Sequence, residues 1–588
     1  MFKPASMTRW YHPPALLAIA ARATVSGLFG EFADRREAMA ASRKIEPEAL
    51  DPAYRYQVAE GESFWFDFMA DTGDGWNPTY AIARLLADPG LKPAQASGEP
   101  TSEVLPIGRL LVMGGDEVYP TASRDDYKRK LIKPLETAAE MSGALTPTTY
   151  DLYAIPGNHD WYDGLTSFLG VFCARRLPGA FNQPHKGRDI GGRRTQQTRS
   201  YFALELPCGW WLWGIDIQLG GYVDQPQVDF FDHVAREWMP KGSKLIIATG
   251  QPEWAYVGVD PEHWKTFRNF SYLESLATLT GREHQVRLVL SGDSHHYARY
   301  TEGDRQYIVA GGGGAFLHPT HQLPKTNTFS YEFPPPGVPA TSGRRSYQRS
   351  FTLQETFPSQ AKSSRIAWKN VFFAFFNPDY WLTLGCACAL FAWLLNANAL
   401  AQGTDLVSML RAGGAGNWWA ALCAYFNLVF ASPWPSLLGL AAAGGYAAFA
   451  KPYGRYGGLV RALAGFAHAA VEILIVVFAT IALAWYLPWV EQCMPWMILA
   501  VGIVGGLLAA TVMGIYLLIS LNGFKLHWNE GFSSMRIQGY KNFLRLKIDA
   551  SGELWVYPIG LERTPKDSGA KPTNPALAPR FIEKPFKV

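Results

Sequence analysis

The second half of the chain contains long apolar segments separated by short polar connections. Between Asn377 and Asn522 charged residues are sparse, and each apolar segment is near or above the roughly 20 residues that cross a bilayer core. None shows the polar face that a helix on a soluble core presents. The pattern therefore predicts four membrane-spanning helices. The segments are Trp381–Leu400, Ser432–Ala450, Ala464–Leu487 and Trp496–Leu521.

The second of these spans has an alternative interpretation. Trp418–Phe430 is also apolar, and Pro433 and Pro435 interrupt the junction between the two pieces. The earlier piece is either an interfacial helix or the start of a kinked span.

The connections between the spans differ in charge. Basic residues precede the first span, join the second to the third and follow the fourth. The other two connections hold Asp405 with Arg411, and Glu491 without a basic residue. Because positively charged loops stay on the cytoplasmic side of a membrane, we expect a multi-pass protein with both termini in the cytoplasm.

The first half of the chain has a different pattern, in which short apolar runs end in clusters of Gly, Asp and Asn. Short runs rich in Val, Ile, Leu and Trp are typical of buried strands. With the polar segments between them, they predict an α/β domain. The runs are Ser63–Ala70, Arg109–Met113, Thr149–Ile155, Trp210–Ile215, Lys244–Ala248, Gln285–Leu290 and Gln306–Ala310.

Candidate metal ligands follow four of these predicted strands. Asp71, Asp116 and Asn158 come after the first three runs, and Asp293 and His295 follow the run that ends at Leu290. In layered α/β folds, polar residues just past the carboxyl ends of strands build the site. Oxygen and imidazole ligands at four strand ends predict a metal cluster in this half of the chain.

Composition narrows the remaining classes of protein. A chain of 588 residues is too long for one ordinary domain, and its 14% aromatic and 18% charged residues exclude a disordered chain. A net charge of +4 is too small to indicate nucleic-acid binding. Six cysteines make no disulfide framework, which favours a reduced compartment.

The two ends of the chain give weaker signals. The apolar run Ala15–Ala21 is too short for a convincing signal peptide, and we expect a helix there that extends to Arg36 and packs on the soluble domain or lies on the membrane. Near the other end, Leu544–Ile548 and Leu554–Ile559 flank Asp549–Gly552, which predicts a hairpin. The expected division is an N-terminal helical segment (1–48), a catalytic domain (49–360), a transmembrane domain (361–522) and a C-terminal cytoplasmic segment (523–588).

Four motifs follow one another at the predicted strand ends. They are Ala70-Asp71-Thr72-Gly73, Gly115-Asp116-Glu117-Val118-Tyr119, Gly157-Asn158-His159-Asp160 and Gly292-Asp293-Ser294-His295. In this order they resemble the motifs of the calcineurin-like metallophosphoesterase superfamily, with the Gly-ending first motif of purple acid phosphatases. The resemblance implies a β-sandwich flanked by helices, followed here by the transmembrane bundle.

The resemblance also implies two adjacent metal ions of divalent or iron/manganese type (Mn, Mg, Fe or Zn). One would be held by Asp71, Asp116, Tyr119 and His295. Asp116 would bridge to the second, which Asn158 and Asp293 would also bind. Paired metal ions generate a hydroxide at neutral pH and clamp the oxygens of a phosphoryl displacement.

His159 and Asp160 would assist that reaction. The resemblance gives His159 the role of stabilising charge on the phosphoryl group or protonating the leaving group, and Asp160 would orient its imidazole.

The sequence departs from the family pattern at two positions. Gly250 stands where the family has a histidine ligand, although Gln251 beside it offers a carbonyl, and Asp293 replaces another histidine. Harder oxygen ligands favour Mg²⁺, Mn²⁺ or Ca²⁺ over Zn²⁺ at the second position. Metal identity therefore stays open at this point.

Several residues near the motifs have two interpretations. Asp74 either supports the site or belongs to a turn, and His296 either contacts substrate phosphate or points away from it. On the third span, His468 and Glu472 lie four residues apart on one helical face. Ionisable groups within a span are costly and often functional, but these two either act or simply pair near the helix end.

Together these observations predict a membrane-anchored, metal-dependent phosphoesterase that hydrolyses a phosphate mono- or diester. Tethering at the bilayer makes a lipid headgroup or another membrane-associated phosphate ester the expected substrate. Two alternatives remain. One is a degenerate phosphoesterase acting as a membrane-bound sensor or binding module, and the other is the regulatory domain of a small transporter.

Overall fold

The computed structural model describes residues 3–17, 20, 21, 24, 50–175, 187–217, 223–258, 263–278, 280–333, 345–450, 458–487, 493–567 and 576–588. The chain divides into two compact units. The first, here called the sheet unit, comprises Met1–Thr8, Ala18–Ser363 and Arg536–Val588. The second, the helical unit, comprises Arg9–Leu17 and Ser364–Met535.

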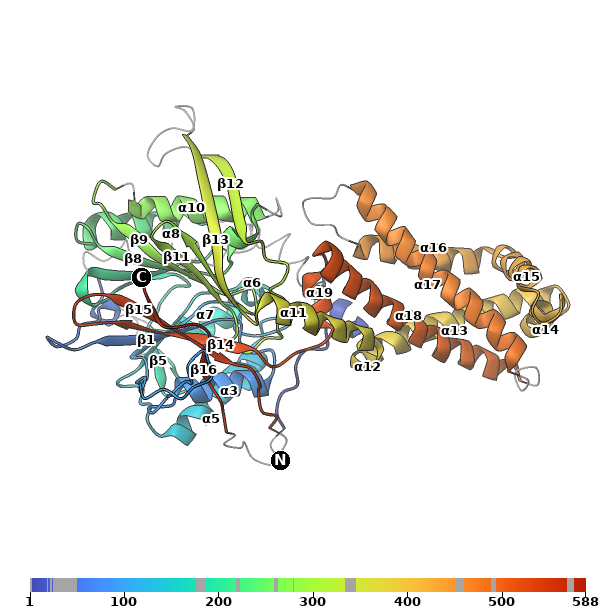
Figure 1. The fold of residues 1–588 in the computed structure, drawn as a ribbon, viewed down its shortest axis with the longest axis horizontal. Coiled ribbons are helices and arrows are strands. Elements are labelled where there is room, and N and C mark those ends of the chain that lie inside the picture. Colours follow the sequence, from blue (N-terminus) through green and yellow to red (C-terminus); the bar gives the residue numbers. More distant parts are fainter. Residues whose placement is uncertain are drawn as a thin grey trace, which may run out of the picture. The chain divides into compact units, whose positions relative to one another are not determined.

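The first sheet of the sheet unit has the strand order β16-β15-β14-β1-β2-β3-β5-β4, with β17 paired to β15 (Figure 1). Strands β1, β2 and β3 run parallel, and β14 pairs antiparallel to β1. Its strands are β1 (Phe64–Met69), β2 (Leu110–Met113), β3 (Asp151–Ala154), β4 (Asp189–Ile190), β5 (Arg193–Thr195), β14 (Lys541–Ile548), β15 (Leu554–Leu561), β16 (Arg580–Phe581) and β17 (Phe586–Lys587).

The second sheet has the order β12-β13-β10-β11-β9-β8-β7-β6. Its central strands β7, β8, β9 and β11 are parallel. The strands are β6 (Phe202–Glu205), β7 (Trp210–Gly214), β8 (Lys244–Thr249), β9 (Gln285–Ser291), β10 (Tyr297–Glu302), β11 (Arg305–Ala310), β12 (Thr326–Phe333) and β13 (Arg345–Phe357).

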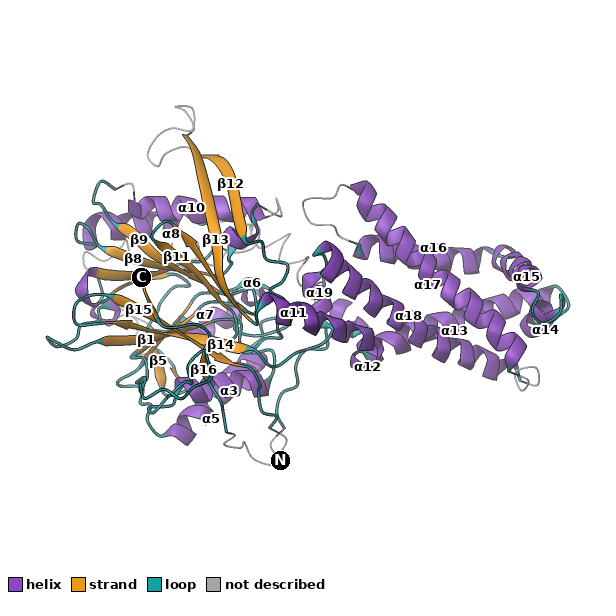
Figure 2. Cartoon of the chain, in the orientation of Figure 1, coloured by secondary structure: helices purple, strands orange, loops and turns teal. Residues whose placement is uncertain are grey.

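The two sheets share one apolar core and carry helices on their other faces (Figure 2). Side chains from both sheets meet in this core, among them Phe66 and Leu544 from the first and Ile246 and Leu290 from the second. A second cluster joins the first sheet to α3 (Trp76–Leu86), α5 (Lys133–Ser142) and α7 (Thr166–Phe172). A third joins the second sheet to α8 (Gln225–His233) and α10 (Trp264–Thr278). The sheet unit is therefore a layered α/β structure.

All seven strands expected in the first half of the chain are confirmed to within two residues at either end. The reason is that parallel strands covered on both faces need apolar side chains at nearly every position. One exception lies inside β1, where Asp67 is completely buried and faces Arg545 of β14 with two contacts of 2.7 and 3.1 Å.

The predicted C-terminal hairpin is also confirmed, as the antiparallel pair β14–β15. It belongs to the sheet unit, because β14 forms five register pairs with β1 in the first sheet. The last residues add the short strands β16 and β17 to β15. The segment expected at 523–588 thus continues the α/β fold from Arg536 onwards.

The helical unit contains three helices that are long and apolar enough to cross a membrane, or up to four if a bent pair is one span. The three are α13 (Pro378–Ala401), α17 (Gly458–Tyr486) and α18 (Met494–Phe524), which confirms the first, third and fourth predicted spans as helices. Shorter helices in this unit are α14 (Leu406–Arg411) and α19 (Trp528–Ser533).

The expected second span has a different form. It consists of α15 (Trp418–Phe430) and α16 (Pro433–Phe449), which are bent by 97° at a short break. Pro433 takes the first position of α16, where a proline without an N–H is tolerated, and the helix before it has to end.

Small residues allow α13 and α18 to approach closely. A methyl group added to Gly506 would lie 2.4 Å from the Trp381 carbonyl oxygen, and one added to Gly385 would lie 2.7 Å from the Gly502 carbonyl oxygen. Close backbone approach through glycine is a common way to pack helices in a membrane, where burial from water no longer drives association.

The expected N-terminal helix lies mostly outside the described residues. Residues 13–17 are helical, but the region from 25 to 49 is not described. The same holds for Lys451 and Arg455, two of the basic residues between the second and third expected spans, and for Glu491.

Candidate metal centre

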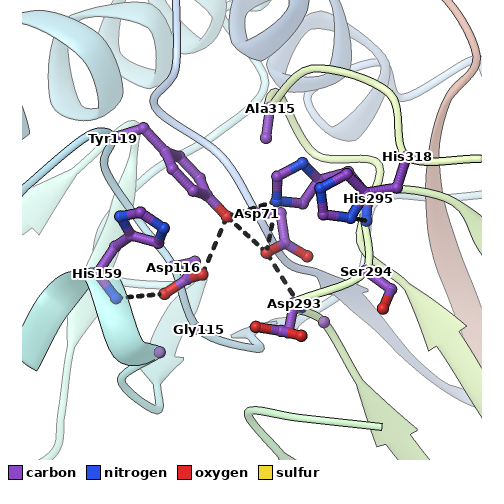
Figure 3. Close-up of polar contacts among 12 residues, drawn as sticks. Asp71, Gly115, Asp116, Tyr119, His159, Asp293, Ser294, His295, Ala315 and His318 are labelled. Carbon is purple, nitrogen blue, oxygen red and sulfur yellow. Dashed lines mark hydrogen bonds and ion pairs between the residues drawn. The ribbon is translucent and has the colours of Figure 1, made fainter. Parts of the chain in front are cut away.

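Strands from both sheets deliver Asp71, Asp116, Asp293 and His295 to one place. Asp71 follows β1, Asp116 follows β2, and Asn158 is the first residue of α6 (Asn158–Trp161), shortly after β3. Asp293 and His295 follow β9 of the second sheet. Figure 3 shows the side chains of Asp71, Asp116, Asp293 and His295 close together, with the Tyr119 ring reaching in beside them.

Three of these acidic residues have an unusual backbone conformation. The φ angles are 57° at Asp71, 53° at Asp116 and 63° at Asp293, which is the left-handed region that side chains other than glycine rarely adopt. Each occurs where the chain turns sharply just past a strand. Strained residues of this kind gather at functional sites, where the surrounding fold holds them.

The Tyr119 hydroxyl lies at the centre of the cluster. Its oxygen is 2.8 Å from Asp71 Oδ1, 3.0 Å from Asp116 Oδ2 and 2.8 Å from His295 Nε2. The backbone N–H of Asp293 also donates to Asp71 Oδ1, at 3.0 Å. Three atoms of the kind that bind metals therefore surround the phenolic oxygen of Tyr119, which is itself a fourth.

These four atoms have too few protons for their contacts. His295 Nδ1 lies 2.8 Å from the Phe316 carbonyl oxygen, which can only accept, so Nδ1 carries the proton and Nε2 of the neutral ring presents a lone pair. The single proton of the Tyr119 hydroxyl then faces three acceptors. An additional positive charge, from protons or from a cation, is needed to balance the cluster.

Burial also makes the negative charge of the carboxyl groups unfavourable. Removal from water raises the pKa of Asp71 well above its usual value, and the nearby carboxylates of Asp116 and Asp293 raise it further. Burial raises the pKa of Asp116 to about 7. For Asp293, burial and then the charge of Asp116 raise the pKa to about 7. The charged form of these carboxyl groups is therefore unfavourable unless protons or cations balance it.

The residues present fit the metal ions that the resemblance implies. Asp71 Oδ2 and Asn158 Oδ1 are buried and have no hydrogen-bond partner in the described part of the chain. By a count of His, Cys, Asp and Glu alone, no group of three within the described ranges could hold a metal ion. Asp71, Asp116 and His295 meet instead at the Tyr119 hydroxyl, a hard donor that this count leaves out.

His159 lies next to this set. Its backbone N–H donates to Asp116 Oδ1 at 2.9 Å, and its ring packs against that of Tyr119 with centroids 4.4 Å apart. Ring atom Nδ1 is 2.6 Å from the Pro120 carbonyl oxygen, and burial lowers the pKa of His159 to about 4. The imidazole is therefore neutral at physiological pH, with its proton on Nδ1.

The recorded contacts give Asp160 a different role from the one expected. Its carboxylate accepts hydrogen bonds from the backbone N–H groups of Gly157 and Glu117, at 2.9 and 3.2 Å, and from the Tyr127 hydroxyl. Asp160 is the third residue of α6 and caps the start of that helix. Orientation of the His159 ring falls instead to the Pro120 carbonyl.

The three secondary candidates lie in distinct surroundings. Asp74 is fully buried and accepts a hydrogen bond of 3.0 Å from the backbone N–H of Thr8. The Gln251 side chain hydrogen-bonds to Asp293, which places it beside the centre. His296 is completely buried near the carbonyls of His318 and Pro319, and burial lowers its pKa to about 3. That position supports packing of the loop rather than contact with a substrate.

No pattern in the sequence indicates the residues that hold His295. The loop after β11 supplies the Phe316 carbonyl. Residues from the C-terminal segment hydrogen-bond to this loop. Lys541 Nζ donates to the Ala315 carbonyl, and the Asn542 N–H donates to the Gly312 carbonyl at 3.0 Å. These contacts depend on the pairing of β14 with β1, which the local sequence pattern does not predict.

Comparisons with known proteins add little to this description of the site. No protein-family model and no curated protein matches the chain. A solved structure described as "GAP50 the anchor in the inner membrane complex of Plasmodium" matches with 10% identity and a TM-score of 0.30. The match covers 44% of this chain and 74% of that one, and a TM-score this low carries no argument.

Proposed function

We propose that this protein is a membrane-anchored, metal-dependent phosphoesterase of the calcineurin-like metallophosphoesterase type. One observation carries the proposal. Asp71, Asp116 and His295 present acceptor atoms 2.8–3.0 Å from the Tyr119 oxygen, at strand ends that carry the four motifs in family order. The layered sheet unit, with helices outside two facing sheets, is consistent with the sandwich expected for this family.

In this proposal Asp71, Asp116, Tyr119 and His295 hold one cation, and Asp116, Asn158 and Asp293 hold a second. When bound, such ions lower the pKa of a water molecule and neutralise charge on a phosphoryl group. Gln251 orients the Asp293 carboxylate through its hydrogen bond. The Phe316 carbonyl fixes the tautomer of His295 that leaves Nε2 available as a ligand.

His159 transfers a proton to the leaving group in this proposal. Because its Nδ1 proton is held by the Pro120 carbonyl, the neutral ring accepts at Nε2 the proton that the attacking water molecule loses. It then passes that proton to the leaving oxygen of the ester. Packing against the Tyr119 ring keeps the imidazole in place.

The topology of the sheet unit supports a position on one side of a membrane. Since β14 pairs with β1, the chain that leaves the sheet unit after Ser363 must return to the same side before Arg536. This requires an even number of crossings, which is met when the bent pair α15–α16 crosses along with α13, α17 and α18. In this proposal that side is the cytoplasm, which the basic residues that flank the first and last spans favour. The proposed substrate is a phosphate ester of a lipid or of another membrane-associated molecule.

The test is hydrolysis by the purified chain. An aryl phosphate monoester and diester are offered with Mn²⁺, Mg²⁺, Fe²⁺ or Zn²⁺ in turn. We expect turnover with at least one metal, and a loss of at least about a thousandfold in Asp116→Asn and Asn158→Ala. Asp125→Asn is the matched control, because its side chain is 70% exposed and pairs only with Arg129 among the described contacts.

Absence of hydrolysis with every metal, in protein that still binds metal, would overturn the proposal. It would favour the sensor or binding module instead. The observation behind that second candidate is the presence of Gly250 and Asp293 where the family has imidazole ligands.

A further inference from the structure

The helical unit contains a large apolar cavity of about 730 Å³, a volume typical of small-molecule sites. Helices α13, α15, α16, α17 and α18 all contribute to its lining. Most of the surface is aliphatic or aromatic, as represented by Leu384, Phe391, Val429, Leu438, Ile473 and Met513. A cavity of this kind within helices of spanning length accommodates a hydrocarbon chain.

One carboxylate interrupts the apolar lining. Glu472 of α17 lines the cavity, although the residue is only 4% exposed. Its nearest counterpart is His468, one turn earlier on the same helix, with 3.3 Å between His468 Nε2 and Glu472 Oε1. The Tyr446 hydroxyl hydrogen-bonds to Glu472, but this donor is neutral and does not balance the charge of the carboxylate.

Among the side chains that the structure describes, the groups around this pair supply no fixed positive charge. Tyr446 of α16 lies beside both residues, with its ring 4.4 Å from that of His468, and Tyr380 and Cys388 of α13 face Glu472. On the other side of His468 lie Tyr516 of α18 and His527, which hydrogen-bond to each other at 3.0 Å. The residues that line the cavity include no lysine or arginine.

A buried carboxylate without a stable cation is costly in apolar surroundings and usually has a functional reason. The imidazole of His468 balances it only by taking a proton in a place that disfavours the charged ring. A ligand that brings its own cation removes this cost. The Glu472 carboxylate therefore favours a ligand with a cationic head group, and the apolar lining favours a hydrocarbon chain.

We propose that this cavity binds an amphiphile, whose hydrocarbon chain lies among the apolar side chains and whose protonated primary amine pairs with the Glu472 carboxylate. This site is separate from the metal centre, since every residue that lines it belongs to the helical unit. The proposal does not depend on phosphoesterase activity.

The test uses the full chain, purified in a neutral detergent, and native mass spectrometry to measure bound amphiphile. Three probes with the same chain are compared: oleylamine, oleyl alcohol and oleic acid. We expect the wild type to bind oleylamine at least about tenfold more tightly than oleyl alcohol, with oleic acid the weakest. Glu472→Gln, which keeps the shape of the side chain, should reduce oleylamine binding to the level of the alcohol.

Two further variants fix the position of the site. Gly439 lines the cavity and a methyl group added there meets nothing within 4 Å, so Gly439→Phe should enter the cavity and weaken oleylamine and oleyl alcohol alike. Asp379→Asn is the control, because it removes an acidic group of α13 that pairs with Arg9 and does not line the cavity. It should bind all three probes as the wild type does.

Three results would overturn the proposal. They are equal binding of amine and alcohol by the wild type, unchanged oleylamine binding in Glu472→Gln, and unchanged binding in Gly439→Phe. The last would place the amphiphile on another surface of the helices.

Discussion

The sheet unit and the helical unit both bury charged side chains, but the charges are balanced to different degrees. In the sheet unit, Arg545 and Asp67 are completely buried and form a bidentate pair, and Arg545 also donates to the Leu105 carbonyl. In the helical unit, Glu472 and His468 approach to 3.3 Å without an aligned hydrogen bond between them.

The sheet unit contains both situations within a few residues of β1. Asp67 lies inside the strand and its charge is fully matched, whereas Asp71, just past the strand, shares too few protons with Asp116, Tyr119 and His295. Side chains whose polar atoms are satisfied within the chain hold the fold together. Those left unbalanced indicate where the chain binds something else. The following predictions test that distinction.

The largest expected effect concerns the satisfied pair. Asp67→Asn leaves the Arg545 guanidinium buried without its counter-charge, so it should lower the free energy of unfolding of the sheet unit by about 3–5 kcal/mol. Denaturant titration of the full chain in detergent, followed by tryptophan fluorescence, measures this loss. Glu562→Ala breaks a pair with Arg580 whose side chains are 51% and 31% exposed, and it should cost less than about 1 kcal/mol. Equal costs for the two variants would contradict the comparison.

A smaller effect is expected from pH in metal-free protein. Burial raises the pKa of Asp116 and Asp293 to about 7 and, with the charge of Asp116, that of Asp160 to about 8. The folded state therefore holds protons that the unfolded chain has already released, so stability falls as pH rises from about 6.5 to 8. Lys541, His159 and His296, whose pKa values burial lowers to about 7, 4 and 3, act in the opposite direction. Burial also raises the pKa of Asp71 and Glu117 well above their usual values, which adds to the fall.

The expected loss in this window is about 2 kcal/mol, measured by thermal unfolding after treatment with a chelator. Added Mn²⁺ should restore the stability at pH 8, because cations replace the lost protons. If the metal-free protein becomes more stable between pH 6.5 and 8, the acidic cluster is not unbalanced in the way described.

The smallest expected effect concerns Gln251, which contacts a proposed ligand but is not one. Gln251→Ala removes the hydrogen bond to Asp293 and should weaken one of the two metal sites by about tenfold, leaving the other unchanged. Titration with Co²⁺, followed by its visible absorption, resolves the two sites. The control is Gln225→Ala, which breaks an exposed contact of 2.7 Å with Asp229 on α8. A change of the same size in both variants would contradict a specific role for Gln251.

The sequence pattern predicted the regular elements because their causes are local. Strand β1 is apolar since it is covered on both faces, and α18 is apolar throughout since it has the length of a span. For α15 and α16 the pattern does not distinguish an interfacial helix from a kinked span, because a proline at a helix start permits either a break or a continuation. Composition alone does not decide the angle between the two pieces.

The sequence predicts only those site residues whose positions follow from the ends of the strands. Asp71, Asp116 and His295 converge as expected, because their strands end near one another. The carbonyls of Pro120 and Phe316 carry no side-chain signal, and Lys541 reaches the loop only through the pairing of β14 with β1. The Asp160 side chain points toward the backbone because it caps the start of α6.

The most direct test of the account is the metal content of the purified chain after incubation with Mn²⁺, Fe²⁺, Zn²⁺ and Mg²⁺ and removal of unbound ions. Elemental analysis should find close to two ions per wild-type chain, because Asp116 bridges two proposed sites. Asp116→Asn should retain fewer than one, and Asp125→Asn should match the wild type. A wild-type chain that retains no ion under any of these conditions, or an Asp116→Asn variant that retains as many as the wild type, would contradict the proposed centre.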